Sequence, residues 1–384
     1  MRLHRFEGTQ RTRPPEETWQ AIRPLLPGFG ITRVADVTAL DDLGIPVAMA
    51  IRPLSQTLTP AQGKGATLEA ARVSAAMEAI EVWHAERAVP SAPVTDASAR
   101  DLQLPYDVRA LELPEGNLVT AGVRMAWLPA RSLLTQEQVL VPAGAVRLSR
   151  TVRDDFRMHL ATASTNGLAS GNSLAEAQVH ALCEVIERDV LSGMDTAHPG
   201  EIIDAGSVTD QHCTGLLERL KGCWLELRHV TNRFRVPVMT CHLWREDQSA
   251  ATVAGAGCHP DPAIALSRAI TEAVQTRLTH ITGSREDCRP FVYDSRPHPA
   301  PRRSERAAVA WHLISTRYEA APIADTSLAL VLAGIVAKAA GVTPLFVDLT
   351  QGAHRQDEFA VVKVLAPGLR YAARHTVPRP LEAR

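Results

Sequence analysis

The pattern of apolar positions predicts four long helices. The first reads V-S-A-A-M-E-A-I-E-V-W from Val73 to Trp83, and it is apolar nearly all round a helix. This stretch therefore predicts a buried helix over about residues 68–86. Further helices are predicted over about residues 174–193, 263–281 and 327–340, and a short one near residues 18–26.

Short runs of β-branched and aliphatic residues between these helices predict strands. Residues 31–34 and 45–51 form the first two, and the turn sequence Leu40-Asp41-Asp42-Leu43-Gly44 predicts a hairpin-like connection. Later strand-like runs occupy residues 139–142, 224–230, 236–244, 343–348 and 360–365. Strands and helices do not alternate regularly, so we expect an α+β fold with mostly antiparallel sheets and packed Ala-rich helices.

Three of the long helices share one pattern, Ala-x3-Ala-x2-Glu-x2-(Glu/Gln), which aligns without a gap. It runs from Ala71 to Glu81, from Ala177 to Glu187 and from Ala265 to Gln275. Each copy follows a segment rich in glycine and alanine that is predicted to be a loop, at residues 63–65, 169–171 and 254–257. Such an internal repeat is evidence of shared structure, although its period is far longer than that of a solenoid.

Carboxylates recur on one face of these helices. Ser74, Glu78 and Glu81 fall at steps of four and three, which places them on neighbouring turns. Like charges one turn apart on a buried helix repel, and each desolvated carboxylate is costly unless it is compensated. No lysine or arginine lies three or four residues from Glu78. The compensating charge must therefore come from elsewhere.

A bound cation is one source of that charge. Carboxylate clusters without histidine and cysteine ligands select hard ions such as magnesium, calcium or manganese. Magnesium usually binds with substrate phosphates, so several carboxylates beside Gly-rich segments indicate ions on a nucleotide. Lys64 between two glycines, Arg188 and Arg268 are then candidates for phosphate contacts.

Two alternatives stay open at this point. The glutamates could form ion pairs with arginines from other elements and serve packing only. His180, which takes the helical position of Ser74, could contact phosphate or be a hydrogen-bonded core residue. A P-loop is excluded, because the chain contains no G-x4-G-K-[ST] sequence.

Composition narrows the class of protein. The 384 residues carry a formal net charge of −1, so no basic field favours nucleic acid or an anionic membrane. The N-terminus lacks the apolar run of a signal peptide, and no stretch is long and apolar enough to span a bilayer. The six cysteines are scattered, which argues against a zinc site and fits a reducing compartment. We therefore expect a cytoplasmic protein.

The motifs together resemble the YcaO family. They comprise residues 63–67 with the Ser74-x3-Glu78-x2-Glu81 pattern, residues 166–172 with residues 184–189, and residues 265–277. The resemblance covers about residues 40–370, so it implies a YcaO-like catalytic domain there. Residues 1–39 would then be an N-terminal extension and residues 371–384 a C-terminal tail.

The resemblance implies an enzyme that uses ATP and Mg2+ to activate a backbone amide of a peptide or protein. A nucleophile adds to the amide carbonyl, the oxygen is phosphorylated, and phosphate leaves to give a thioamide, an azoline or an amidine. Carried over by position, the implied metal ligands are Glu78, Glu81, Glu176, Glu184, Glu187 and Glu272. The implied nucleotide contacts are Lys64, Ser74, Asn172, His180, Arg188, Arg268 and Gln275. Glu78, Glu187 and Arg188 are the implied catalytic residues.

The C-terminal sequence of this chain differs from that of the azoline-forming members, which narrows the choice of nucleophile. Those members resemble one another in a Pro-rich C-terminus, whereas this chain has two spaced prolines, Pro378 and Pro380, and four residues beyond them. Residues 30–65 resemble stand-alone members that work beside a TfuA-like partner protein and install a thioamide from sulfide. Thioamide formation is therefore the leading expectation, while azoline and amidine formation stay open.

Rival classes are a non-catalytic or regulatory ATP-binding protein, a small-molecule kinase or ligase, and a scaffold. Peptide-dependent ATP turnover would distinguish the expected enzyme from each of them. The expected partners are a peptide or protein substrate and a TfuA-like protein, and a homodimer stays open.

Overall fold

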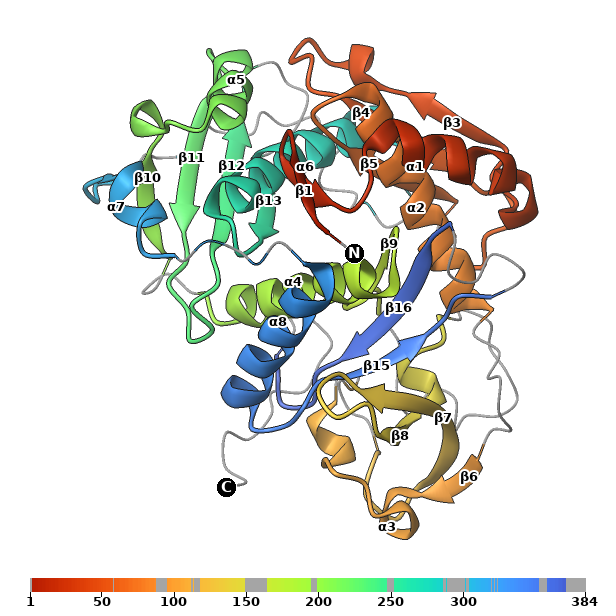
Figure 1. The fold of residues 1–384 in the computed structure, drawn as a ribbon. Coiled ribbons are helices and arrows are strands. Elements are labelled where there is room, and N and C mark those ends of the chain that lie inside the picture. The colour runs from red at the N-terminus through yellow and green to blue at the C-terminus, as the bar shows by residue number, and fades with distance from the viewer. Residues whose placement is uncertain are drawn as a thin grey trace. The chain divides into compact units, whose positions relative to one another are not determined.

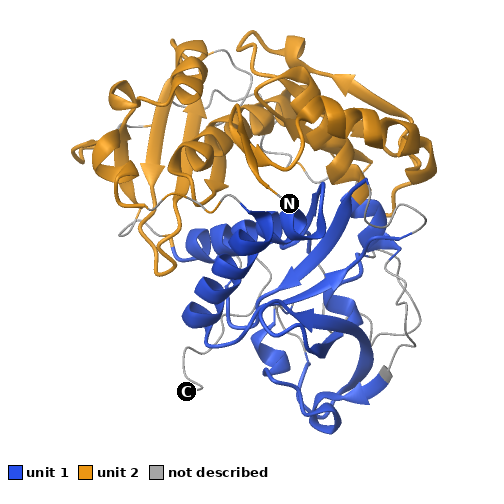
Figure 2. Cartoon of the chain, viewed as in Figure 1, with its two compact units in different colours: residues 1, 81–193, 324–384 blue, residues 2–80, 194–323 orange. Residues whose placement is uncertain are grey.

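A computed structural model describes residues 2–57, 59–87, 95–111, 113, 118–148, 164–194, 199–246, 252–285, 288, 301, 304–318, 320, 322, 324–351 and 358–370. The chain divides into two compact units, shown in different colours in Figure 2. Unit 1 comprises residues 1, 81–193 and 324–384, and unit 2 comprises residues 2–80 and 194–323.

Unit 2 contains a hairpin and two sheets (Figure 1). The hairpin pairs β1 (His4–Phe6) with β2 (Thr9–Arg11). A three-stranded antiparallel sheet has the order β3 (Arg33–Asp36), β4 (Val47–Ile51), β5 (Pro60–Lys64). A five-stranded sheet has the order β13 (Val253–Cys258), β12 (Val238–Trp244), β11 (Trp224–His229), β10 (Glu201–Asp204), β14 (Val309–Ala310), and its β10–β14 pairing is parallel.

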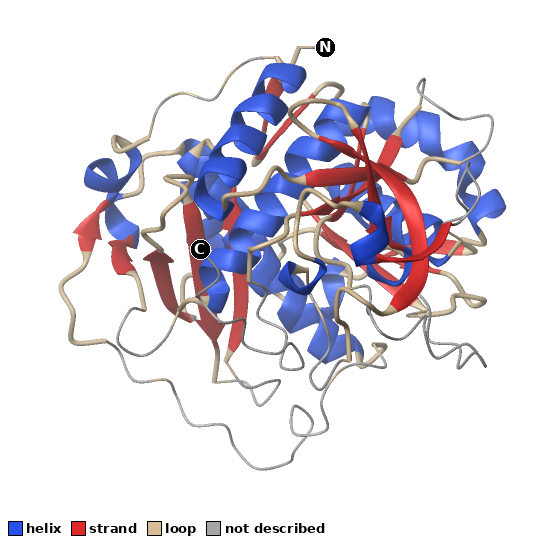
Figure 3. Cartoon of the chain, turned by 90° about the horizontal axis from the view of Figure 1, so that it is seen from below, coloured by secondary structure: helices blue, strands red, loops and turns tan. Residues whose placement is uncertain are grey.

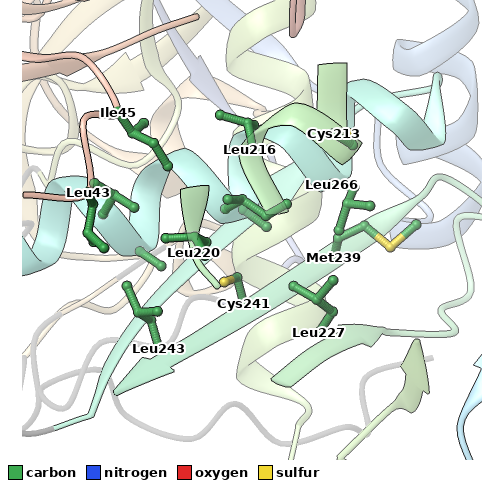
Figure 4. Close-up of a cluster of buried hydrophobic side chains, with 14 of the residues drawn as sticks. Leu43, Ile45, Cys213, Leu216, Leu220, Leu227, Met239, Cys241, Leu243 and Leu266 are labelled. Atoms are coloured by element: carbon green, nitrogen blue, oxygen red, sulfur yellow. The ribbon is translucent and has the colours of Figure 1, made fainter. Parts of the chain in front are cut away.

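Unit 2 also contains helices and 3-10 turns. They are α1 (Pro15–Ile22), α5 (Gln211–Arg219), α6 (Pro262–Thr282), α7 (Trp311–Ser315) and the 3-10 turns η1 (Arg23–Phe29), η2 (Thr38–Leu40) and η6 (Ala205–Ser207). Figure 4 shows Leu216 of α5 and Leu220, which directly follows α5, beside Leu266 of α6 and Met239 of β12, all buried. Burying this apolar face is what holds α5 and α6 on the five-stranded sheet.

Unit 1 is built on one antiparallel sheet. Its order is β6 (Thr95–Ser98), β7 (Arg124–Ser132), β15 (Leu345–Asp348), β16 (Ala360–Leu365), β9 (Leu168–Gly171), and β8 (Gln138–Pro142) pairs with β7. Its helices are α3 (Ala99–Leu102), α4 (Leu174–Ser192) and α8 (Asp325–Ala340), with turns η3 (Val108–Ala110) and η4 (Ala143–Ala145). Helix α2 (Leu68–Glu86) belongs to unit 2 up to Ile80 and to unit 1 from Glu81.

The predicted fold class is confirmed: helices and mostly antiparallel strands make up the described chain (Figure 3). The hairpin-like connection is confirmed by the antiparallel pairing of β3 with β4. The predicted bounds of the four long helices lie within two residues of the observed ones. Among the described helices, none combines the length and the apolar character that crossing a bilayer requires. The domain boundaries and the cytoplasmic location stay predictions, and the tail at 371–384 lies outside the described residues.

The prediction of Gly-rich loops before the repeated helices was wrong. Gly63, Gly171 and Gly257 lie in strands, β5, β9 and β13. A Cβ atom on Gly63 would lie 2.0 Å from the backbone nitrogen of Ala75, and one on Gly257 would lie 2.1 Å from the carbonyl oxygen of Ala265. The glycines and the repeated alanines therefore serve one purpose, which is to let each strand approach the helix that follows it.

Candidate functional site

The repeat consists of three strand–helix copies, β5–α2, β9–α4 and β13–α6 (Figure 1). Each of the three strands lies at the edge of its sheet. An edge strand has backbone N–H and C=O groups outside the ladder, and these groups need other partners when they are buried. The predicted site residues supply several of these partners.

In unit 2, two predicted site residues bind the backbone of Gln62 in β5. The N–H of Gln62 donates to Glu78 Oε2 at 3.2 Å, and the Gln275 side-chain amide donates to the Gln62 carbonyl at 3.4 Å. Gln62 is buried, so these contacts satisfy polar groups that solvent cannot reach. Glu78 of α2 and Gln275 of α6 are thereby both held against β5.

An ion pair also links β5 to α6. Lys64 Nζ lies 2.5 Å from Glu272 Oε2, and both side chains are partly buried. An ammonium group has three donors, so this pair is compatible with a phosphate contact by the same lysine. It is also the kind of pair that the packing alternative predicts.

His259, which precedes α6, is buried near several arginines. Burial, together with the nearby positive charges of Arg268, Arg11 and Arg5, lowers the pKa of His259 to about 3. His259 is therefore neutral at physiological pH, and its Nδ1 accepts a hydrogen bond from the Asp261 N–H at 2.9 Å. Arg268, the predicted phosphate contact, therefore lies close enough to His259 for its charge to lower the pKa of the imidazole.

In unit 1, a similar contact lies one residue before β9. The N–H of Gly167 donates to Glu184 Oε2 at 3.3 Å, as the N–H of Gln62 does to Glu78. Arg188, one turn further along α4, lies 3.7 Å from the other oxygen of Glu184. The carboxylate at this position of the repeat therefore accepts a backbone N–H in two copies, from the strand itself in one and from the residue before the strand in the other.

Ser170 occupies the position in β9 that Lys64 occupies in β5. Its hydroxyl donates to Glu81 Oε1 at 2.6 Å. Its carbonyl oxygen lies 3.4 Å from His180 Nδ1, which fits the hydrogen-bonded alternative for this histidine. Glu187, which lies on helix α4 like His180, is buried.

Asn172 and Glu176 form a buried pair at the start of α4. The Asn172 side-chain amide lies 3.1 and 3.3 Å from the two oxygens of Glu176, and the Asn172 N–H also donates to Glu176 at 3.2 Å. Ser173 caps the helix by accepting the N–H of Glu176 at 3.1 Å. The contacts of Glu176 are therefore compatible with a role in capping the helix as well as with a role as a metal ligand.

Sequence reasoning missed several residues beside the predicted ones. Gln62 and Ser170 lie in the strands that precede the repeated helices. Extending the aligned repeat towards the N-terminus would therefore have found them. Asp325 of α8 lies outside the repeat and carries no such signal. It is buried and accepts from the Ser173 hydroxyl at 2.7 Å. Burial would raise the pKa of Asp325, but hydrogen bonds from Ser173 and Thr326 contribute to a net lowering.

The structure thus groups the predicted residues into two sets. Glu78, Lys64, Glu272 and Gln275 gather around β5 in unit 2, with Ser74 and Arg268 on the same two helices. Glu81, Asn172, Glu176, His180, Glu184, Glu187 and Arg188 belong to unit 1. Within the described chain, no three acidic, histidine or cysteine side chains form a ready-made metal cage. Magnesium commonly takes one or two carboxylates together with phosphate oxygens, and oriented glutamates of this kind fit that donor set.

Comparison with known proteins agrees with this chemistry. A family described as YcaO cyclodehydratase, ATP- and Mg2+-binding, matches residues 62–370. An uncharacterised protein of Mycobacterium tuberculosis strain H37Rv is 38% identical over 98% of this chain and 86% of its own length. A Rhizobium leguminosarum bv. trifolii protein, named as lying in the tfuA 3' region, is 38% identical over 73% of this chain and 69% of its own.

A solved structure shares the fold. The structure of YcaO from Methanopyrus kandleri, bound with AMPPCP and Mg2+, superposes with a TM-score of 0.71 at 24% identity. The superposition covers 100% of this chain and 99% of that one. The likeness shows that this chain has the fold of that structure.

Proposed function

Because this chain belongs to the YcaO family, whose enzymes use ATP and Mg2+ to modify peptide backbones, we propose that it converts a backbone amide of a ribosomally made peptide or protein into a thioamide. One observation supports the use of magnesium and ATP most directly. Glu78, Glu184 and Glu272 hold the same position in three strand–helix copies, and each carboxylate is bound by a residue in the preceding strand or directly before it. Fixed orientation of ligands by outer partners is characteristic of metal sites.

The proposed roles are those that the resemblance to the family implies. Glu78, Glu81, Glu176, Glu184, Glu187 and Glu272 would hold magnesium. Lys64, Ser74, Asn172, His180, Arg188, Arg268 and Gln275 would bind the nucleotide. Bound magnesium would supply neutralisation of the phosphate charge. Among the catalytic residues Glu78, Glu187 and Arg188, the guanidinium of Arg188 would stabilise negative charge on the transferred phosphoryl group.

The proposed overall reaction balances without an oxidant or a reductant. A backbone amide, hydrogen sulfide and ATP give the thioamide, ADP, phosphate and a proton. The amide C=O bond breaks and a C=S bond forms, while the carbonyl oxygen leaves as an oxygen of phosphate. ATP therefore drives an exchange that would otherwise release water.

The choice of sulfide as the nucleophile is supported by one related protein. The Rhizobium protein is named for its place beside tfuA, and residues 30–65 of this chain resemble the members that work with a TfuA-like protein. Cyclodehydration is the second candidate, because the family description names that reaction. It would use a side-chain nucleophile of the substrate and give an azoline.

A direct experiment distinguishes these outcomes. The chain would be incubated with ATP, Mg2+, sulfide, a TfuA-like protein from the same genome and peptides encoded beside its gene. A mass gain equal to replacement of oxygen by sulfur supports thioamide formation, whereas loss of one water indicates an azoline. ATP binding without peptide-dependent ADP release would instead favour a non-catalytic ATP-binding protein.

Binding measurements test the site independently of the substrate. ATP would be titrated with and without Mg2+ against wild type and the variants Glu78→Ala, Glu184→Ala and Glu187→Ala. We expect each variant to weaken ATP binding in the presence of Mg2+ by at least about tenfold. Unchanged affinity in all three variants would contradict the proposed metal site.

A further inference from the structure

Buried lysine is unusual in this chain. Of its 41 lysine and arginine residues only four are lysine. Lys221 and Lys338 are exposed, and Lys64 pairs with Glu272. Lys363 of β16 is only 2% exposed. Burying an ammonium group costs free energy unless several acceptors surround it, so its surroundings need an explanation.

The ammonium group of Lys363 binds the backbone of the segment that leads into β9. Its Nζ donates to the carbonyl oxygen of Ser164 at 2.7 Å and to that of Asn166 at 2.5 Å. Strand β16 pairs with β9, and Lys363 lies opposite Leu168 in the register. A compact ammonium can serve two converging carbonyls, whereas the planar fork of arginine suits carboxylates and phosphates.

The next residue, Gly167, is held at a fixed place on β16. Its carbonyl oxygen accepts the N–H of Val364 at 2.7 Å. Its φ of +73° lies in the region that favours glycine, and a Cβ atom there would lie 2.3 Å from the Val364 carbonyl oxygen. The conformation of this turn is therefore restricted by the space beside β16, and Lys363 and Val364 both donate hydrogen bonds to the turn.

The same turn orients Glu184. The N–H of Gly167 is the donor to Glu184 Oε2, at 3.3 Å. Lys363 and Glu184 thus lie at opposite ends of one short chain of contacts, from ammonium to the Asn166 carbonyl, through the peptide to Gly167, and on to the carboxylate. All of these residues belong to unit 1.

We infer that Lys363 is a positioning residue, which fixes the turn at residues 164–167 so that the Gly167 N–H orients the Glu184 carboxylate for magnesium. This inference rests on the proposed role of Glu184 as a magnesium ligand. Without the ammonium group the two carbonyls lose this donor, the turn moves, and Glu184 loses the contact that orients its Oε2. The cost falls on magnesium affinity, because a mobile carboxylate must be ordered when the ion binds.

The test measures the Mg2+ concentration needed for half-maximal binding of ATP by full-length protein. We expect Lys363→Met to raise it about tenfold, the lower end of the range for partners that orient metal ligands. Lys363→Arg keeps the cation and should raise it less. Lys338→Met, which removes an exposed lysine of α8 in the same unit, should leave it unchanged.

Loss of stability alone has to be separated from loss of positioning. Leu128→Ala truncates a buried side chain of β7, a strand that β15 and β16 separate from β9. It should lower the thermal midpoint without changing the Mg2+ requirement. The double variant Lys363→Met/Glu184→Ala should need no more Mg2+ than Glu184→Ala alone, because both changes remove the same contribution.

The outcomes distinguish this inference from the proposed function. If Glu184→Ala binds Mg2+ and ATP like wild type, the proposed role of Glu184 is overturned. If Glu184→Ala weakens binding while Lys363→Met does not, only the role of Lys363 is overturned. Should Lys363→Met fail to fold, Lys363→Arg and Gly167→Ala perturb the same turn. Unchanged Mg2+ dependence in both of these would equally overturn the inference.

Discussion

Lys64 of β5 and Glu272 of α6 form an ion pair of 2.5 Å that joins the first strand–helix copy to the third. Ser170, at the equivalent position of the second copy, donates to Glu81 in the helix of the first copy. In both cases a strand residue of one copy reaches a carboxylate of another. The repeat therefore supplies the side chains, and pairing between copies orients them.

This ion pair yields a prediction about nucleotide binding. Lys64→Met removes a cation from the set around β5 and leaves the charge of Glu272 facing any incoming phosphate. We expect ATP to bind at least about tenfold more weakly, the effect of losing one charge-assisted hydrogen bond. Isothermal titration with ATP and Mg2+ measures it. The control Arg72→Met removes the cation of a more exposed pair on α2, and an equal effect there would contradict a specific role for Lys64.

Close approach of strand and helix predicts which glycines are essential. Gly63→Ala would place a Cβ atom 2.0 Å from the Ala75 backbone, so β5 and α2 must separate. We expect a loss of about 1–3 kcal/mol or more in the free energy of unfolding, measured with denaturant. Gly28→Ala is the matched control in unit 2, because nothing lies within 4 Å of its added Cβ. Its effect should stay within about 0.5 kcal/mol.

The neutral His259 predicts a loss of stability in acid. Burial, aided by Arg268, lowers its pKa from 6.5 to about 3, so below pH 6.5 the unfolded chain binds more protons than the folded one. Its contribution is fully present above pH 6.5 and is lost as the pH falls towards 3. The slope from this group is at most about 1.4 kcal/mol per pH unit.

His259→Asn removes this titration and retains an acceptor for the Asp261 N–H. The free energy of unfolding, measured with denaturant between about pH 7 and about pH 4, should therefore depend less steeply on pH in this variant than in wild type. His312→Asn, at an exposed histidine of α7, serves as the control. Identical slopes for all three proteins would contradict the assignment.

A buried ion pair outside the candidate site predicts a large loss of stability when one of its partners is removed. Arg277 of α6 donates to Asp41, in the turn between β3 and β4, at 2.7 Å, and the side chains are 5% and 4% exposed. Asp41→Ala leaves the guanidinium buried without this carboxylate. We expect a loss of about 3–5 kcal/mol in stability by denaturant unfolding. Glu218→Ala breaks the exposed pair with Lys221, and the expected change is below about 1 kcal/mol.

The sequence was most informative where structure is local. The long helices end within two residues of their predicted bounds, because apolar spacing and helix propensity act over a few turns. The strands at Ala360–Leu365 and Trp224–His229 were equally visible as apolar runs. The segments around Gly63, Gly171 and Gly257 were misjudged, because glycine is unfavourable in strands unless another backbone approaches closely.

By itself, then, the sequence determined the register of the three copies and the positions of their carboxylates, because helical spacing is set by the chain alone. Tertiary structure decided the partners. Lys64 and Glu272 are 208 residues apart, and Lys363 lies 197 residues from Asn166, so nothing in their local sequence links them. Sheet edges bring these residues together, since the unpaired backbone groups and charges there must find partners that only folding can supply.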